Sequence, residues 1–486
     1  MQRPISESLK TNPFRDRDVF DAAGKKVRGK EVFIGVEGKG KSRRLIYLDE
    51  KDLSTHTLLL GATGVGKTVL LTNVVCQFIR NGWPIFCYDF KGDEGLLKAA
   101  WTTACLCGRQ KDFQLFNPSA ALTTSGWTGE LGSCSYNPSV SIKSGAALSN
   151  AELRAAAGKA SGSVEYWAKV TEDLVKNMNA AMIGTGKAFS ARDKYIALLR
   201  QDAMQLLINE TSDVDARLYW QHVLAGWQSK PDEYEKSVKG TQMFYSRFGT
   251  GAFAKIMNSY TPDITAVEAY GTNKIVWNIL PSMSLLSDAR ALAKLQLSDV
   301  LTLAGQIQSS TSKKRPCLIL IDEARHAIFE SFSDALAQGR SAGFWVFMGL
   351  QSISQIDQET SLDYRKELQT NLRNVICMST GNDHASAEEF SKMFGEADMK
   401  TMTKVGDMNM SETSARNVTA TDIMQMRDFQ MQVRTPYNTH NGHITALYDP
   451  DAFELGVDVP KPSWEPTVDR ENGLRLFERI VPEGVI

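Results

Sequence analysis

The sequence lacks the features of several protein classes. Its 55 basic and 56 acidic residues give a formal net charge of −1, so no overall positive charge marks a nucleic-acid-binding protein. Seven cysteines, an odd number scattered over 486 residues, favour reduced core cysteines in a cytosolic protein over a disulfide framework. No run approaches the ~18 apolar residues of a membrane-spanning helix, and the polar amino terminus excludes a signal peptide. We therefore expect a soluble globular protein.

One short segment carries a complete phosphate-binding motif with the spacing G-x-x-x-x-G-K-[ST]. Its residues are Gly61, Ala62, Thr63, Gly64, Val65, Gly66, Lys67 and Thr68. The apolar run 57–60 before it predicts a buried strand, and the apolar stripe of 69–80 predicts a helix, which is the setting in which such a loop binds phosphate. Backbone N–H groups and the helix N-terminus then face the phosphates, Lys67 reaches the β- and γ-phosphates, and Thr68 is a ligand for Mg²⁺. The sequence therefore predicts a nucleoside triphosphate site.

An apolar run from 317 to 321 precedes two adjacent carboxylates, Asp322 and Glu323. In P-loop enzymes a strand of this kind ends in the aspartate that holds the metal, so Asp322 is the candidate partner of Mg²⁺. Glu323 is the candidate general base that polarises the attacking water. An ordinary strand end with solvated acids is the alternative, which the presence of the P-loop disfavours.

Three more residues are candidates for catalysis. Gln351 follows the predicted strand 344–350, a place where ring ATPases use a polar side chain to sense the γ-phosphate. Arg340 precedes this strand and Arg373 precedes the next, so either is a candidate arginine finger for a neighbouring subunit. A surface arginine is an equal alternative for each.

The segment DFKGD, residues 89–93, begins at the carboxyl-terminal end of the predicted strand 84–90. Ligands of α/β sheets bind at the carboxyl ends of strands, so Asp89 and Lys91 are candidates for contacts with the nucleotide or its metal ion. A plain turn is the alternative.

The pattern of elements predicts an α/β protein of two or three domains. Strand-like runs occur before about 140 and after 270, whereas apolar residues three or four apart predict helices between them. The expected parts are a β-rich lead-in (1–54), two parts of a nucleotide-binding domain (55–145 and 261–455), an all-α insert (146–260) and a carboxyl-terminal tail (456–486).

These motifs together resemble a known family. DFKGD matches its D-x-K-G-D motif, and two asparagine-proline pairs, LILIDEA, and a G-R-x-x-G strand ending in glutamine occur in the family's order between about 55 and 380. The asparagine-proline pairs are Asn117-Pro118 and Asn137-Pro138. The chain thus resembles the type IV secretion and conjugation coupling proteins (TraD/TraG-like), in the FtsK/HerA branch of P-loop motor ATPases.

The resemblance implies a RecA-like domain with a central, mostly parallel sheet and an inserted all-α domain, assembled as a ring of six. It implies ATP and Mg²⁺ as cofactors and a DNA-translocating ATPase. The implied partners are single-stranded DNA, a relaxase or relaxosome, type IV secretion channel ATPases and inner-membrane components. The expected location is the cytoplasmic face of the bacterial inner membrane.

Two departures from the family bear on this expectation. Members usually begin with a transmembrane anchor, which this sequence does not show, so membrane contact is expected through an anchor outside it or through a partner protein. The long acidic tail of some members is also missing. Two other functions remain open: a HerA-like translocase acting on duplex ends with a nuclease, and a nucleotide-gated receptor that recruits secretion substrates without moving them.

Overall fold

The computed structural model describes residues 19–20, 26–27, 31–38, 44–122, 131–156, 164–311, 314–329, 332–359, 362–403 and 409–444. The chain divides into two compact units. The first comprises Met1–Ile85, Asp93–Arg109 and Lys313–Leu455, and the second comprises Phe86–Gly92, Gln110–Ser312 and Gly456–Ile486.

The first unit contains a mixed sheet in the order β4-β3-β15-β14-β11-β5-β10-β9. The strands are β3 (Val32–Glu37), β4 (Arg44–Leu48), β5 (Thr57–Leu60), β9 (Cys317–Asp322), β10 (Phe344–Leu350), β11 (Asn374–Cys377), β14 (Gln430–Arg434) and β15 (Thr439–His443). Strands β11, β5, β10 and β9 are parallel, and the remaining four continue the sheet in antiparallel pairs. The α/β class predicted from the sequence is confirmed, with β3 and β4 of the expected lead-in joining the antiparallel flank.

The parallel strands are buried along their whole length, which explains their sequences. Strands β5, β9 and β10 read TLLL, CLILID and FWVFMGL, and every residue in them is buried. Continuous apolar runs of this kind suit parallel strands covered on both faces. In this core the ring of Trp345 on β10 packs edge-on against Phe78 and Trp83, with centroid distances of 5.8 and 5.6 Å.

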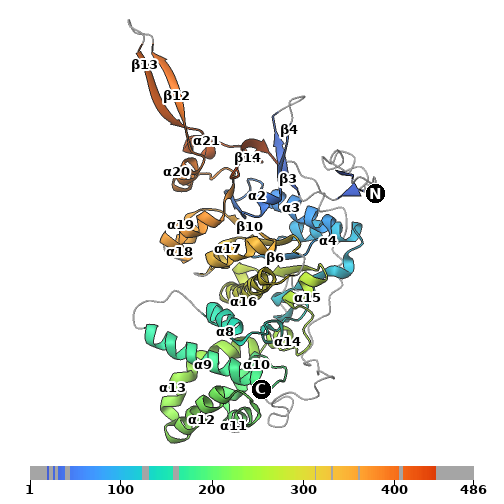
Figure 1. Ribbon diagram of the computed structural model, residues 1–486, viewed down its shortest axis with the longest axis vertical. Coiled ribbons are helices and arrows are strands. Elements are labelled where there is room, and N and C mark those ends of the chain that lie inside the picture. Colours follow the sequence, from blue (N-terminus) through green and yellow to red (C-terminus); the bar gives the residue numbers. More distant parts are fainter. Residues whose placement is uncertain are drawn as a thin grey trace. The chain divides into compact units, whose positions relative to one another are not determined.

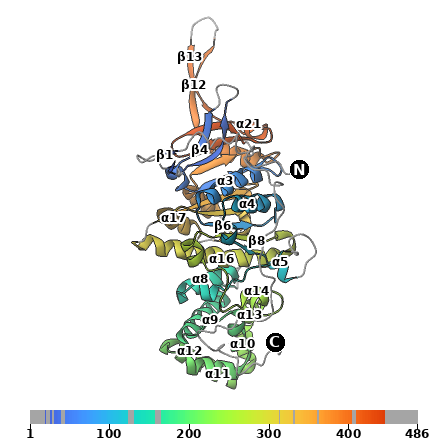
Figure 2. The same cartoon turned by 90° about the vertical axis from the view of Figure 1, so that its right-hand side faces the viewer.

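Helices of the first unit lie between its strands along the chain. They are α2 (Glu50–Leu53), α3 (Lys67–Asn81), α4 (Glu94–Leu106), α17 (Phe332–Ala342), α18 (Ser354–Glu359), α19 (Leu362–Asn371), α20 (His384–Met393) and α21 (Ala420–Met424). Helix α3 packs along α4 (Figures 1 and 2), and α17 packs along α19 (Figure 1). The chain crosses the sheet in one direction from β9 through α17 to β10 and on through α19 to β11, so right-handed crossovers place α17 and α19 on the same face. The hairpin β12 (Glu396–Thr403) and β13 (Asn409–Arg416) extends beyond α20 and α21 (Figure 1).

The second unit combines three strands with most of the helices. Its strands lie in the order β6 (Ile85–Asp89), β8 (Ile275–Ile279) and β7 (Phe113–Phe116). Its larger helices are α8 (Gly145–Ala156), α9 (Val164–Gly184), α10 (Ala191–Leu199), α11 (Gln201–Glu210), α12 (Val214–Ser229), α13 (Pro231–Gly249) and α16 (Ser282–Ser309). Its shorter helices are η4 (Gln110–Asp112), α5 (Pro118–Ala121), α7 (Pro138–Ser141), α14 (Ala254–Met257) and α15 (Ala266–Gly271). The tail expected at 456–486 lies outside the described residues.

The expectation that all cysteines lie in the core is wrong for two of them. Five are buried, namely Cys76, Cys87, Cys134, Cys317 and Cys377. Cys105 is half-buried and Cys107 is exposed. These two stand at the carboxyl-terminal end of α4, where the last turn leaves the protein interior.

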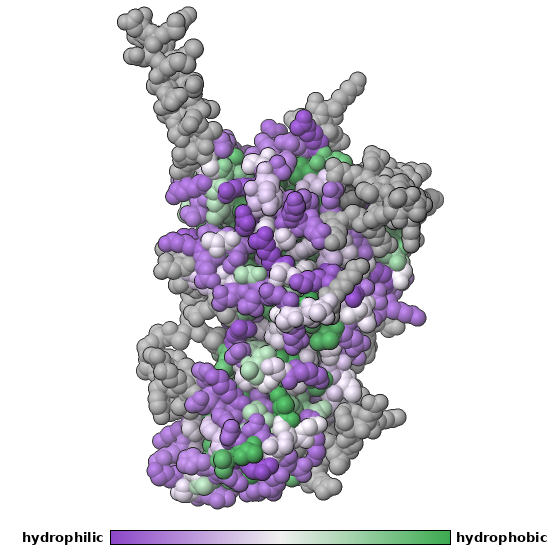
Figure 3. Space-filling model, in the orientation of Figure 1, coloured by the Kyte–Doolittle hydropathy of each residue, from purple (hydrophilic) through white to green (hydrophobic). Residues whose placement is uncertain are grey.

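The described surface carries scattered apolar side chains. On the face shown in Figure 3, hydrophilic residues predominate and apolar residues are interspersed among them. Such a distribution is ordinary for a protein surface in water. Within the described ranges, none of the helices combines the length and the apolar character needed to cross a membrane.

Candidate nucleotide-binding site

The phosphate-binding motif forms the loop between β5 and α3, as predicted. Gly64 and Gly66 have φ angles of 87° and 110°, in the left-handed region that favours glycine, and Gly66 caps the N-terminus of α3. Two backbone hydrogen bonds fasten the start of the loop: Gly61 N donates to Leu350 O (3.3 Å) and Ala62 N donates to Ser379 O (2.8 Å). The loop is therefore fixed to the carboxyl ends of the two strands that flank β5.

Lys67 lies under this loop. Its ammonium donates hydrogen bonds to the carbonyl oxygens of Gly61 and Ala62, the latter at 2.8 Å, and the side chain is only 4% exposed. Thr63 and Gly64 are exposed at the tip of the loop, and Thr68 is half-buried in the first turn of α3. The ammonium thus sits where phosphate oxygens would compete with the loop carbonyls for its protons.

Asp322 ends β9, one strand away from the P-loop strand. Strand β10 lies between β9 and β5, so about 10 Å separates their backbones. The carboxylate is buried, and its Oδ1 accepts the N–H of Glu323 at 3.1 Å. A Cβ placed on Gly349 of β10 would lie 3.2 Å from this Oδ1, so the glycine leaves room for the carboxylate beside β10.

Glu323 has an unusual backbone conformation. Its φ and ψ are 57° and 52°, and it caps the short helix η5 (Ala324–His326). A left-handed conformation costs a residue with a side chain about 1–2 kcal/mol, so the surrounding structure must hold it in place. The Gln351 amide donates a hydrogen bond to Glu323 Oε1, while the Gln351 backbone N–H donates to Gln355 Oε1 at 3.1 Å. The structure therefore joins the predicted base and the predicted sensor directly.

Hard oxygen donors are available for a magnesium ion. Thr68 supplies a hydroxyl and Asp322 a carboxylate, the ligand types that Mg²⁺ prefers, and bound phosphates and water would complete its shell. No group of three or more His, Cys, Asp and Glu side chains in the described part of the chain is arranged to hold a metal ion by protein ligands alone. This donor set fits an ion that arrives with a nucleotide.

Both candidate arginine fingers lie at the amino-terminal ends of the parallel strands, whereas the P-loop lies at the carboxyl ends. Arg340 is exposed near the end of α17, just before β10 starts, and Arg373 is exposed just before β11 starts. Arg373 lines a pocket of about 430 Å³ together with the cationic side chains of Lys366 and Arg434. Because the P-loop follows the carboxyl end of β5, neither arginine reaches the chain's own nucleotide site. A role toward a neighbouring subunit remains a prediction.

A buried histidine marks the same amino-terminal edge. His56 Nε2 donates to Leu336 O (2.8 Å), and Nδ1 accepts the Val346 N–H (3.3 Å), a pattern that requires the neutral ring. Burial lowers the pKa of His56 to about 4, and the positive charge of Arg340 acts in the same direction. The histidine thus fastens β5 to α17 and β10 only while it is uncharged.

We expect the unfolding free energy to fall by up to about 3 kcal/mol as the pH decreases from 6.5 to 4 because of His56. Between pH 6.5 and 4 the unfolded chain binds a proton at residue 56, whereas the folded chain stays mostly unprotonated there. Folding therefore becomes less favourable as the pH falls. Urea unfolding at several pH values checks this. The His56→Asn variant should lack this part of the decline, whereas His384→Asn, at an exposed position, should retain it. Equal slopes for all three proteins would contradict the assignment.

The predicted DFKGD contacts are organised as a turn. The Asp89 carboxylate is buried and its Oδ1 accepts the N–H groups of Lys91 (3.0 Å) and Gly92 (2.9 Å). Asp93 caps α4 by accepting the Leu96 N–H at 3.0 Å. The Lys91 side chain is exposed. These bonds account for the two aspartates structurally, and contacts of Asp89 and Lys91 with nucleotide remain a prediction.

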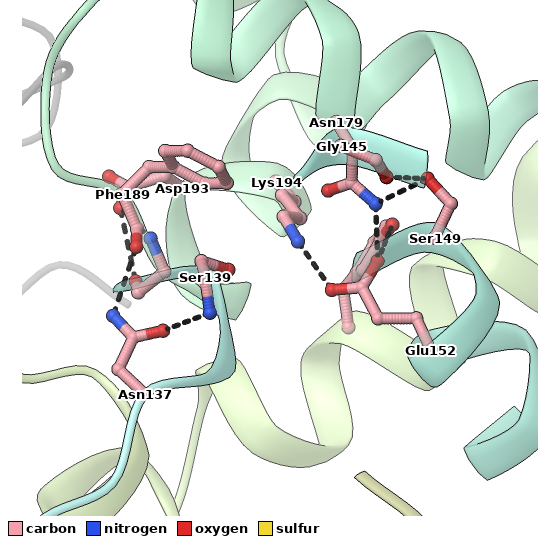
Figure 4. Close-up of polar contacts among 11 residues, drawn as sticks. Asn137, Ser139, Gly145, Ser149, Glu152, Asn179, Phe189, Asp193 and Lys194 are labelled. Atoms are coloured by element: carbon pink, nitrogen blue, oxygen red, sulfur yellow. Dashed lines mark hydrogen bonds and ion pairs between the residues drawn. The ribbon is translucent and has the colours of Figure 1, made fainter. Parts of the chain in front are cut away.

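Asn137, of the second asparagine-proline pair, forms hydrogen bonds to three separate parts of the second unit. Its Oδ1 accepts the Ser139 N–H at 3.0 Å at the start of α7, and its Nδ2 donates to Phe189 O and Ser259 O, both at 2.9 Å (Figure 4). Phe189 precedes α10, and Ser259 follows α14. The asparagine therefore links the start of α7 to two points within 146–260, the range expected for the insert.

Sequence reasoning missed the loop after β11. Besides its carbonyl bond to Ala62, Ser379 donates from its hydroxyl to Met424 O (3.2 Å) and accepts the Gly381 N–H (3.2 Å). The segment STGN at 379–382 has the composition of a loop after a strand, which was the available signal. Its contact with the P-loop depends on the strand order, which local sequence does not specify.

Comparisons with known proteins identify relatives in sequence and fold. Residues 316–431 match the family model described as the TraM recognition site of TraD and TraG, and residues 36–126 match the one described as helicase HerA-like C-terminal. A comparison with curated protein sequences gives no match.

Solved structures share the fold at low sequence identity. The unbound bacterial conjugative coupling protein TrwBdeltaN70 aligns with a TM-score of 0.63 and 18% identity, covering 82% of this chain and 87% of that chain. TrwB with ADP and Mg²⁺ gives 0.61 and 18%, covering 86% and 95%. VirB4 of Thermoanaerobacter pseudethanolicus gives 0.51 and 12%, covering 86% and 97%. The sequence matches and the shared fold confirm the resemblance: this chain is similar to the TraD/TraG-like coupling proteins and to the HerA-like group of P-loop proteins.

Proposed function

We propose that the chain is an ATP-hydrolysing coupling protein that recruits single-stranded DNA, with a relaxase or protein substrate, and moves it into a type IV secretion channel during conjugation. Hydrolysis is supported above all by the hydrogen bond from Gln351 to Glu323, at the sheet edge that also carries the P-loop. The coupling role is supported by the match of residues 316–431 to a TraD and TraG family model. Nucleotide and Mg²⁺ use is supported by TrwB, which was solved with ADP and Mg²⁺ and with an ATP analogue.

The P-loop residues bind the triphosphate in this proposal. Backbone N–H groups of the loop and the N-terminus of α3 face the phosphates. The Lys67 ammonium exchanges its two bonds to loop carbonyls for bonds to phosphate oxygens, which are stronger acceptors because they are charged. Thr68 and Asp322 would hold Mg²⁺, which would neutralise charge on the phosphates.

Glu323 accepts a proton from the attacking water, and Gln351 orients its carboxylate. A carboxylate with a hydrogen bond on Oε1 has one preferred orientation, and its other oxygen is then the proton acceptor. Asp322 Oδ1 accepts the N–H of Glu323, and this hydrogen bond helps to fix the carboxylate of the metal ligand relative to the backbone of the base. The two carboxylates therefore serve different functions.

A ring of six subunits would give Arg340 or Arg373 a partner. Both lie away from the chain's own P-loop, and an arginine finger acts in trans in many P-loop ATPases. In this proposal the ring assembles at the cytoplasmic face of the inner membrane, with channel ATPases and inner-membrane components as partners.

A second function, translocation on duplex DNA together with a nuclease, is supported by the match of residues 36–126 to the HerA-like model. The two functions differ in the DNA that they engage. Single-stranded DNA should stimulate a conjugative motor more strongly, whereas duplex ends should stimulate a HerA-like motor. The receptor alternative predicts nucleotide binding without turnover.

We expect DNA-stimulated ATP turnover that rises cooperatively with protein concentration and falls about 10²–10³-fold in Lys67→Ala, because the variant loses a charge that stabilises the transferring phosphate. Steady-state ATPase assays with single-stranded and duplex DNA measure it. The exposed Lys392→Ala variant, on α20, serves as the control for a lost positive charge. Tight ATP binding without turnover in any condition would contradict the motor and support the receptor.

A further inference from the structure

An exposed aromatic ring lies directly against the P-loop. Phe429 stands between α21 and β14, and its side chain is 43% exposed although it is large and apolar. Its φ of 66° is in the left-handed region, which a residue with a side chain rarely adopts. The fold therefore holds a phenylalanine in a strained conformation without burying it.

Backbone hydrogen bonds fix this residue on the loop. The Phe429 N–H donates to Val65 O at 2.8 Å, and the Phe429 carbonyl accepts the Ile444 N–H at 2.8 Å. The loop residue Val65 is thereby tied to the segment that enters β14. Each bond involves only the main chain, so substitution of the side chain leaves both donors and acceptors in place.

The ring reaches the cap of α3. A Cβ on Gly66 would lie 2.7 Å from Cδ1 and 3.2 Å from Cε1 of Phe429, so the ring occupies the space that the missing side chain leaves free. Gly66 is the N-cap of α3, and the phosphates of a bound nucleotide are expected at this N-terminus. An exposed aromatic surface thus borders the place from which the ribose and base of that nucleotide extend.

We propose that Phe429 is the platform on which the base of the bound nucleotide stacks. The inference rests on the proposed ATP site and adds the residue that recognises the base. Stacking of a base on an aromatic side chain strengthens binding and tolerates different bases, because every base presents a π face. The exposure of the ring and its strained backbone are then consistent with a surface kept open for a ligand.

The competing explanation is that the ring only covers the P-loop and keeps it in shape. The two roles differ in the part of the nucleotide that they affect. A platform acts on the base alone, whereas a cover acts on the phosphates through the loop. Inorganic tripolyphosphate, which has no base, separates these effects.

The test is calorimetric titration of the full chain with ATP and with tripolyphosphate, both in the presence of Mg²⁺. Phe429→Ala should weaken ATP binding about 5- to 100-fold and leave tripolyphosphate binding unchanged. Phe429→Tyr should restore ATP binding, because it returns an aromatic face. Tyr437→Ala, which removes another exposed ring from the same unit, should bind both ligands like the unchanged chain.

Three results would contradict the proposal that Phe429 stacks on the base. Unchanged ATP binding in Phe429→Ala would show that the ring does not contact the base. Equal losses for ATP and tripolyphosphate would assign the ring to the shape of the loop. Failure of the unchanged chain to bind either ligand would remove the proposed nucleotide site itself, and this result is distinct because it appears before any substitution is made.

Discussion

Glu323→Gln is expected to lower ATP turnover about 10²–10⁴-fold while ATP binding stays close to that of the unchanged chain. The amide has nearly the same shape as the carboxylate, and its oxygen can still accept the hydrogen bond from Gln351. It cannot accept a proton from water at neutral pH. The substitution therefore removes the chemical step and retains the geometry.

Equilibrium binding and single-turnover hydrolysis separate these two effects. Glu367→Gln is a suitable control, because it makes the same change at an exposed position of α19. Turnover of the control should equal that of the unchanged chain. If Glu323→Gln hydrolysed ATP at the normal rate, another group would have to be the base, and the bond to Gln351 would have only a structural purpose.

The backbone of Glu323 explains why such a change can be specific. Strand β9 ends at Asp322, and the left-handed residue that follows turns the chain into η5. Glycine would adopt this conformation more readily, so the presence of glutamate at a cost of about 1–2 kcal/mol indicates that its carboxylate is needed there. This reasoning starts from an observed backbone outlier and leads to a functional hypothesis that the substitution tests.

The sequence predicts the P-loop and its flanking elements well because their signals are local. The apolar run 57–60, the glycine spacing and the helical stripe after Lys67 each occupy a few adjacent residues, and the structure confirms the strand and helix that they predict. The same holds for the strand that ends at Asp322. Local patterns of this kind need no knowledge of strand order.

Features that depend on strand order or on single dihedral angles could not be predicted from the sequence. The sequence left Arg340 and Arg373 as equal candidates, and only the parallel order of β10, β5 and β11 shows that both lie at the edge away from the P-loop. Phe429 is more than 360 residues from Val65 along the chain, and its contact with the loop follows from the antiparallel flank of the sheet. No short pattern around it differs from that of an ordinary turn before a strand.

A second large effect is expected at a buried ion pair among the helices of the second unit. The Lys194 ammonium bonds to Glu152 Oε1, and both side chains are almost fully buried, at 0% and 4% exposed (Figure 4). Glu152 Oε2 also accepts from Asn179 Nδ2 (2.9 Å) and Tyr245 OH (3.0 Å). These contacts join α8, α9, α10 and α13, so the pair connects four helices of the second unit.

Lys194→Met is expected to destabilise this helical part by about 3–5 kcal/mol, because it leaves the Glu152 carboxylate buried without its cation. The lost contacts of the ammonium with the rings of Phe189 and Tyr245, both 5.2 Å away, add to the effect. Lys236→Met, on the exposed face of α13, should have little effect and controls for the change in residue type.

The double variant Lys194→Met with Glu152→Gln decides whether the cost comes from the unpaired charge. The neutral amide retains an acceptor for Tyr245 or Asn179, so the double variant should recover most of the stability that Lys194→Met loses. Hydrogen exchange of the amides in α8–α13 measures local stability without assuming that the two units unfold together. If the double variant were as unstable as the single one, the loss would come from the ammonium's missing contacts with the Phe189 and Tyr245 rings and not from the unpaired Glu152 charge.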